Sequence, residues 1–195
     1  MRLTSRLAVP AASAVLILAL SACGSGDDSH GTMSGAGTTS SSTAEGATTS
    51  ATGDVEFAQM MIPHHEQAVE MADLALANDT ASPEVKALAG QIKAAQDPEI
   101  QSMQGWLAQW GASEGSGQMD HGGMMSDDQM SSLMGISGPE FDQMWLTMMI
   151  EHHEGAIEMA QDVLDTTSNP EVEQLATAVV EGQEKEIATM KGMLG

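Results

Sequence analysis

An internal repeat limits the fold of this chain more than any other sequence feature. Residues Met60–Ala72 and Met148–Ala160, 88 positions apart, agree at ten of thirteen positions, and both contain Met-Met-Ile-x-His-His-Glu. Shorter matches, 87 positions apart, follow each copy: Pro83–Val85 with Pro170–Val172, and Glu99–Met103 with Glu186–Met190. The repeating unit is therefore a pair of segments, and the chain contains it twice.

Each segment has the spacing of an amphipathic helix. Inward-facing positions recur at intervals of four and three residues in both copies: Phe57, Met61, His64, Ala68, Met71 and Ala75 in the first, and Trp145, Met149, His152, Ala156, Met159 and Val163 in the second. Caps before first-turn prolines predict helix starts at Ser82-Pro83 and Asn169-Pro170, and Ser137 with Glu140 predicts a capping box. Four such helices predict an all-α four-helix bundle made of two hairpins.

The predicted bundle occupies residues 54–195, with repeat one at 54–110, a connecting loop at 111–138 and repeat two at 139–195. Before it, residues 23–53 are nearly all Gly, Ser, Thr and Ala, which predicts a disordered tether. Two prolines, Pro63 and Pro98, fall inside predicted helices and have no proline counterpart in repeat two. We therefore expect the two hairpins to differ locally.

Residues 1–22 have the pattern of a signal peptide. Arg2 and Arg6 precede an apolar run, which ends in Leu20-Ser21-Ala22 just before Cys23. This ending is similar to a bacterial lipobox, so we expect an exported protein with lipid on Cys23, held at the outer face of the cell membrane. An uncleaved membrane anchor and an ordinary secretory signal are the alternatives.

Charge and cysteine content exclude several classes of function. Cys23 is the only cysteine, so disulfides and thiolate metal sites are excluded from the bundle. Beyond residue 22, four lysines stand against 28 acidic residues. Such a surface repels nucleic acid and attracts cations. The sequence does not identify a protein partner.

The paired histidines carry the sharpest chemical signal. They lie on the inward stripes, and each has a methionine four residues earlier: Met60 before His64, Met61 before His65, Met148 before His152, and Met149 before His153. Carboxylates interrupt the apolar stripes of the following helices at Glu99 and Glu186, each followed at i+4 by a methionine, Met103 and Met190. These carboxylates either bind a metal directly or fix a histidine tautomer.

Thioether sulfur with neutral imidazole favours Cu(I) over Mg²⁺, Ca²⁺ or Mn²⁺. Copper is therefore the predicted metal. Methionine also fills gaps in cores, and buried histidines can be hydrogen-bonded structural residues, so packing alone is the alternative interpretation. A second soft-ligand cluster lies in the connecting loop and forms either a metal site or a linker: Met119, His121, Met124 and Met125.

No catalytic motif is present. The Glu-x-x-His pattern of di-iron bundles is missing, because Met61, Ile62, Met149 and Ile150 occupy the positions three residues before the histidines. His-Glu-x-x-His is missing too. We expect a binding protein that is not an enzyme; a metal-dependent redox enzyme and a metal-free structural bundle are the alternatives.

The doubled Met-Ile-x-His-His-Glu segments, each followed by Gln-x-x-Glu-Ile-x-x-Met, resemble the domain-of-unknown-function family 305. The resemblance implies a ferritin-like four-helix bundle in an exported protein, and a copper-binding role in sequestration, tolerance or transfer. It also implies a set of metal ligands: Met60, Met61, His64, His65, Met71, Met148, Met149, His152, His153 and Met159.

Overall fold

The structure is a computed structural model that describes residues 42–115 and 122–195, with side chains described from residue 51 onward. Its described part is all α-helix, as predicted, with five helices: α1 (Ser42–Ala77), α2 (Pro83–Trp110), α3 (Asp127–Met134), α4 (Pro139–Leu164) and α5 (Pro170–Leu194). None of the helices in this part is both long and apolar enough to cross a membrane. The predicted signal peptide and Cys23 lie outside the described residues.

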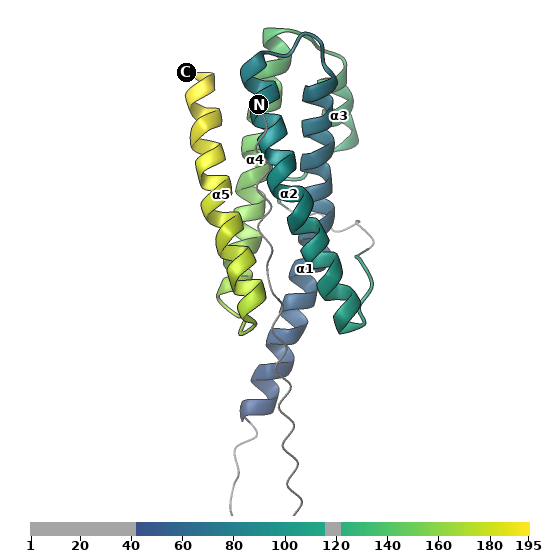
Figure 1. Cartoon of the computed structure of the whole chain (residues 1–195), viewed down its shortest axis with the longest axis vertical. Coiled ribbons are helices and arrows are strands. Elements are labelled where there is room, and N and C mark those ends of the chain that lie inside the picture. The colour runs from purple at the N-terminus through teal and green to yellow at the C-terminus, as the bar shows by residue number, and fades with distance from the viewer. Residues whose placement is uncertain (1–41, 116–121) are drawn as a thin grey trace, which may run out of the picture. The chain divides into compact units, whose positions relative to one another are not determined.

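The two repeats form two antiparallel hairpins. Helix α1 packs mainly against α2 and α4 mainly against α5, and α1 and α4 also contact each other between the hairpins. Figure 1 shows these four long helices, and the short α3 contacts α4. The paired segments of the sequence are therefore the two arms of each hairpin, and the four long helices form the predicted bundle.

All three predicted helix starts are confirmed in position, and two of them have the predicted cap. The Ser82 hydroxyl accepts a hydrogen bond from the Val85 amide, and the Asn169 side chain accepts one from Glu171. The capping box predicted at Ser137 is wrong, because Gly138 occupies the cap position of α4 and no side chain caps that helix. Gly138 has a φ of 63°, a conformation that favours glycine over residues with a side chain.

Two predicted boundaries also need correction. Helix α1 begins at Ser42, twelve residues before the expected start of the bundle, so the second part of the predicted tether is helical. Alanine and glutamate in this stretch favour helix. Extending an existing helix is also easier than starting one, because each added residue forms one further hydrogen bond. The expected loop 111–138 contains α3, which a capping box of Ser126 and Gln129 starts. Eight residues are too few for a clear helical period in the sequence.

Proline 63 lies inside α1 and affects where the connecting segment runs. A proline has no N–H, so the carbonyl of Gln59, four residues earlier, lacks its usual helical donor. The segment after α2 comes close to this point: a Cβ added to Gly115 would lie 2.9 Å from the Gln59 carbonyl oxygen. The Gln59 side chain also donates a hydrogen bond to the Ser113 carbonyl. This part of the link therefore packs against the turn of α1 that precedes Pro63.

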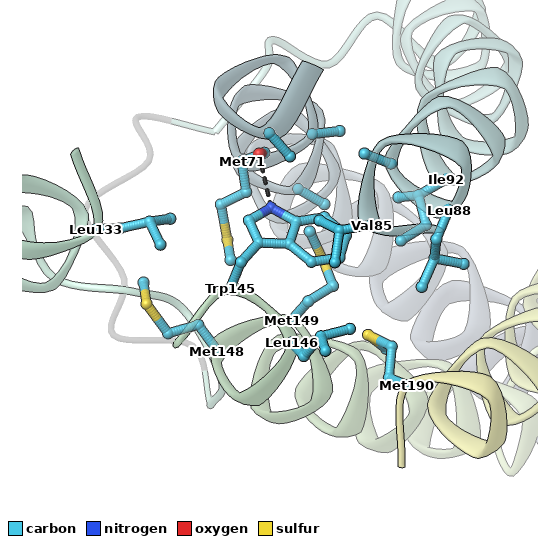
Figure 2. Close-up of a cluster of buried hydrophobic side chains, with 14 of the residues drawn as sticks. Met71, Val85, Leu88, Ile92, Leu133, Trp145, Leu146, Met148, Met149 and Met190 are labelled. Carbon is cyan, nitrogen blue, oxygen red and sulfur yellow. Dashed lines mark hydrogen bonds between the residues drawn. The ribbon is translucent and has the colours of Figure 1, made fainter. Parts of the chain in front are cut away.

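The interior contains two hydrophobic clusters. Cluster 1 includes Met71, Val85, Leu88, Ile92, Leu133, Trp145, Leu146, Met149 and Met190 (Figure 2). Cluster 2 includes Phe57, Met61, Met103, Trp106, Leu107, Val163, Val172 and Val179. On each long helix, one stretch contributes to cluster 1 and another to cluster 2. The residues between the two stretches are mainly polar, and some of them form the candidate site.

Residues 122–125 of the connecting loop contact both repeats, and they do so at positions that correspond to each other in the two repeats. Gln67 on α1 makes two hydrogen bonds with the backbone of Met125, one to its carbonyl at 2.8 Å and one from its amide at 2.7 Å. The counterpart of Gln67, 88 residues later, is Gly155, against which Gly122 and Gly123 pack. The two repeats therefore differ here: α1 forms hydrogen bonds with the loop, whereas α4 has a glycine against which the loop backbone packs closely.

Replacing Gly155 by alanine should displace this loop. The new Cβ would lie 1.9 Å from the Gly122 carbonyl oxygen, so backbone has to move, and we expect a destabilisation of about 1–3 kcal/mol. Gly182→Ala is the matched control, since nothing lies within 4 Å of its added Cβ and alanine stabilises an open helical site by up to about 1 kcal/mol. Urea unfolding followed by circular dichroism measures both; equal effects of the two changes would contradict the packing.

Candidate metal centre

Two polar residues on each long helix separate the two hydrophobic clusters. We call these eight residues the polar layer: His64 and His65 on α1, Gln96 and Glu99 on α2, His152 and His153 on α4, and Gln183 and Glu186 on α5. All of them except the two glutamates are buried. The layer brings together histidines and carboxylates that the sequence singled out separately in each repeat.

The outer histidines are paired with the two carboxylates. His65 Nε2 lies 2.9 Å from Glu99 Oε2, and His153 Nε2 lies 2.7 Å from Glu186 Oε2. An ionised carboxylate only accepts, so in each neutral ring Nε2 carries the proton and Nδ1 has a free lone pair. Both Nδ1 atoms are buried and lack a hydrogen-bond partner among the described residues. The two glutamates therefore fix the tautomer that leaves Nδ1 able to bind a metal.

The inner histidines bring the two repeats into contact. The rings of His64 and His152 have centroids 3.8 Å apart and are tilted by 41°. Both side chains are almost fully buried. The sequence predicted one histidine pair in each hairpin, and the structure brings the two pairs together in one buried layer through the contact of His64 with His152.

The inner ring of His152 is held in its neutral form. Burial lowers its pKa well below the usual value, and the neighbouring rings of His64, His153 and His65 lower it further, while a backbone contact with His64 acts weakly in the opposite direction. A neutral imidazole is the form that binds metals, so protons compete little with a metal at this position.

This pKa shift makes the stability of the metal-free protein depend on pH. Unfolded His152 takes up a proton near pH 6.5 and the folded residue does so only at lower pH, so the unfolded state binds more protons in this range. Stability should be full above about pH 6.5 and fall below it, by up to about 1.4 kcal/mol per pH unit for this one proton. Urea unfolding at several pH values should show a weaker dependence in His152→Gln; an identical dependence would contradict the assignment.

Two glutamines belong to the layer although the sequence did not single them out as site residues. Gln96 lies three residues before Glu99 on α2, and its counterpart Gln183 lies three residues before Glu186 on α5. Gln96 is 2% exposed and neither amide atom has a hydrogen-bond partner among the described residues, and the same holds for Gln183 Oε1. The signal in the sequence was their 87-residue spacing, the same as that of the two glutamates.

Methionines line both sides of the polar layer. Met61 and Met103 belong to cluster 2, and Met149 and Met190 belong to cluster 1. All four are fully buried, and each lies within one helical turn of a layer residue. The two helices of each hairpin are antiparallel, so the two methionines of a hairpin lie on the same side of the layer. Helices α1 and α2 supply the pair on the cluster 2 side, and α4 and α5 supply the pair on the cluster 1 side.

The other predicted ligands lie in different surroundings. Met71 is buried beside Trp145, but its repeat counterpart Met159 is only half-buried. Met60 is half-buried, whereas Met148 is buried and its side chain points toward Leu133 of α3 (Figure 2). The ten predicted ligands are thus not two equivalent sets of five.

The predicted loop site is only partly described. Met119 and His121 lie outside the described residues. Met124 is half-buried, and Met125 is buried in cluster 1 next to the residues that hold the loop. A role for these four residues in metal binding stays a prediction.

The donor atoms fit a soft cation better than a hard one. Within residues 42–115 and 122–195, no three His, Cys, Asp or Glu side chains converge on a point where they could hold a metal ion. A metal in the layer would therefore need thioether or amide donors as well, and buried methionines are present on both sides of it. Histidine nitrogen with methionine sulfur suits Cu(I) and its mimic Ag(I).

These features define a class of protein: a helical bundle of two repeated hairpins that meet at a buried histidine layer. The chain belongs to the family described as Domain of unknown function (DUF305), whose model matches residues 54–194. This confirms the resemblance inferred from the doubled motif.

Several solved structures have the same fold. A DUF305 protein of Streptomyces coelicolor, described as secreted, is 33% identical with a TM-score of 0.69, over 73% of this chain and 91% of that one. A DUF305 fragment from Deinococcus radiodurans is 33% identical with a TM-score of 0.68, over 73% and 95%. CopM in its Cu(II)-bound form is 33% identical with a TM-score of 0.64, over 72% and 95%. CopM is also known in Cu(I)-bound and Ag-bound forms.

A curated viral protein is also similar to part of the chain. It is the uncharacterized protein L153 of Acanthamoeba polyphaga mimivirus, which is 38% identical over 53 residues. The match covers 27% of this chain and 35% of the viral protein. The chain thus spans about a third of the length of this relative, and the similarity carries no functional argument.

Proposed function

We propose that this protein is an exported, non-catalytic copper-binding protein that holds Cu(I) in the polar layer. The observation that carries the proposal is the contact between His64 and His152, which brings the buried imidazoles of both repeats into one layer. Buried polar atoms without partners cost about 1–3 kcal/mol each, and a bound cation would supply the missing partner. His152 and the Nδ1 atoms of His65 and His153 are the donors available for it.

The likeness to CopM supports copper as the metal. That protein is similar over nearly its whole length and has been solved with Cu(I), Cu(II) and Ag. The donor types in the present chain agree, since imidazole and thioether prefer Cu(I) among the common biological metals. The evidence from the ligands and the evidence from the relatives are independent of each other.

The proposed location is the outer face of the cell membrane. The signal pattern ending at Cys23 supports export and a lipid anchor, and the likeness to a secreted relative supports export. There, a formal net charge of −22 would concentrate cations around the protein. Sequestration, tolerance and transfer of copper all agree with such a position.

A competition titration tests this function. The purified full chain should take Cu(I) from a chromophoric Cu(I) chelator under anaerobic conditions, whereas excess Mg²⁺ or Mn²⁺ should not displace the bound copper. Glu99→Gln with Glu186→Gln should weaken the affinity about 10–100-fold, the usual effect of losing residues that orient a ligand. Lys185→Gln is a matched control, because this lysine is exposed at the surface of α5.

Two results would contradict the proposal. If the chelator keeps all the Cu(I), the polar layer is a structural feature. If the copper-loaded protein consumes oxygen through many turnovers, the protein is a redox enzyme rather than a carrier.

A further inference from the structure

A row of three side chains on α4 connects the surface to the polar layer. Met144, Met148 and His152 are spaced four residues apart, so successive members lie about 6 Å apart along the helix and turn about 40° around it. Burial increases along this row. Met144 is half-buried, Met148 is 6% exposed and His152 is 1% exposed. The row therefore leads from solvent to the contact between the two repeats.

The outer end of the row lies between two neighbouring hollows in the surface. Met144 and Met148 line both of them. Glu140 lines the first hollow, and Asp128 on α3 lines the second. Each hollow thus combines two thioethers, which bind soft cations, with a carboxylate, which attracts any cation.

The short helix α3 gives the row its shape. Met130 and Leu133 are buried in cluster 1, which fixes α3 against α4. Figure 2 shows the Met148 side chain directed toward Leu133 and away from Met190. The Met148 sulfur therefore lies on the α3 side of α4, between the surface hollows and the interior.

The first repeat has no such row. The residues 88 positions earlier are Glu56, Met60 and His64, so a carboxylate stands where Met144 has its thioether. No helix corresponds to α3 among the described residues next to Glu56. The difference between the repeats singles out the α4 side.

We propose that Met144 and Met148 form an entry site, at which a soft monovalent cation binds before it passes to His152. The proposal rests on the proposed function, because it needs the polar layer to be the destination. Cu(I) is the cargo, and Ag(I) is a suitable probe because it does not change oxidation state during the measurement. The two carboxylates raise the local cation concentration, and the two sulfurs select the soft cation.

Nuclear magnetic resonance of protein labelled at the methionine methyl groups tests the entry site. On addition of Ag(I) below one equivalent, the methyl signals of Met144 and Met148 should shift together with the ring signals of the layer histidines. In stopped-flow mixing, Met144→Leu should slow the binding of Ag(I) to the histidines about tenfold. This is the effect expected if the lost thioether lowers the free-energy barrier to entry by about 1.4 kcal/mol. Met134→Leu is the control, since Met134 is 61% exposed and lines neither hollow. It should load at the normal rate.

Leucine is close to methionine in volume, so Met144→Leu should fold, and circular dichroism with a thermal melt checks this. Histidine signals that shift while those of Met144 and Met148 stay unchanged would overturn the entry site and leave the proposed function intact. An unchanged loading rate in folded Met144→Leu would do the same. Histidine signals that never respond to Ag(I) would overturn both.

Discussion

Protein with both His64→Ala and His152→Ala is expected to bind Cu(I) at least about 100-fold more weakly than the unmodified chain. Structural zinc sites owe about 10–16 kcal/mol to roughly four ligands, so the loss of the His152 donor, together with the ring packed against it, should cost about 2.7 kcal/mol or more, which is a 100-fold change. The two rings are also the contact that joins the hairpins at the centre. Competition with a chromophoric chelator gives the affinities.

The same variant separates metal binding from folding. It removes two buried rings, so a loss of packing accompanies the loss of donor atoms. His64→Leu with His152→Leu keeps more of the side-chain volume and serves as the control for packing. Both double variants should lose copper, whatever their stability. Normal affinity in either would show that the centre lies elsewhere.

Trp145→Ala should be among the most destabilising single changes in the protein. The indole is fully buried in cluster 1, and its Nε1 donates a 2.8 Å hydrogen bond to the Met71 carbonyl, which ties α4 to α1 (Figure 2). Truncation of a buried tryptophan costs about 3–5 kcal/mol, a large share of the 5–15 kcal/mol that stabilises a typical domain. Chemical unfolding followed by circular dichroism measures the loss.

Two further variants divide this effect into its parts. Trp145→Phe keeps most of the apolar contact but loses the hydrogen bond, so its cost should be intermediate. Trp110→Ala is the control, because Trp110 is only half-buried, near the end of α2. If Trp110→Ala were as damaging as Trp145→Ala, the link between α4 and α1 would not be the source of the effect.

The helices and the pairing of histidine with glutamate could be predicted because their signals lie within single segments. The 4-3 spacing around His64 shows which face of α1 is buried. A charge among apolar residues, as at Glu99, is costly unless it is paired, and a histidine was one of the two partners expected for it. In the structure Glu99 hydrogen-bonds with His65 and Glu186 with His153, which agrees with the second of the two roles expected for these carboxylates.

The features that were missed depend on how the two repeats pack together. No pattern within one repeat shows that His64 touches His152, because that contact depends on the angle and register between hairpins. Gln96 was missed for a related reason, since an amide at a helix position is ordinary until its neighbours are known to be buried. The unequal surroundings of Met60 and Met148 arise from α3, which is too short for a clear pattern in the sequence.

The contact between His64 and His152 also bears on how the two-repeat chain arose by duplication. Each hairpin carries only half of the polar layer, so an ancestral protein of one hairpin would complete the centre only by pairing with a second copy of itself. Fusion of two such copies would make the partnership permanent and independent of concentration. It would also free the two halves to diverge, as Gln67 and Gly155, or Glu56 and Met144, have done.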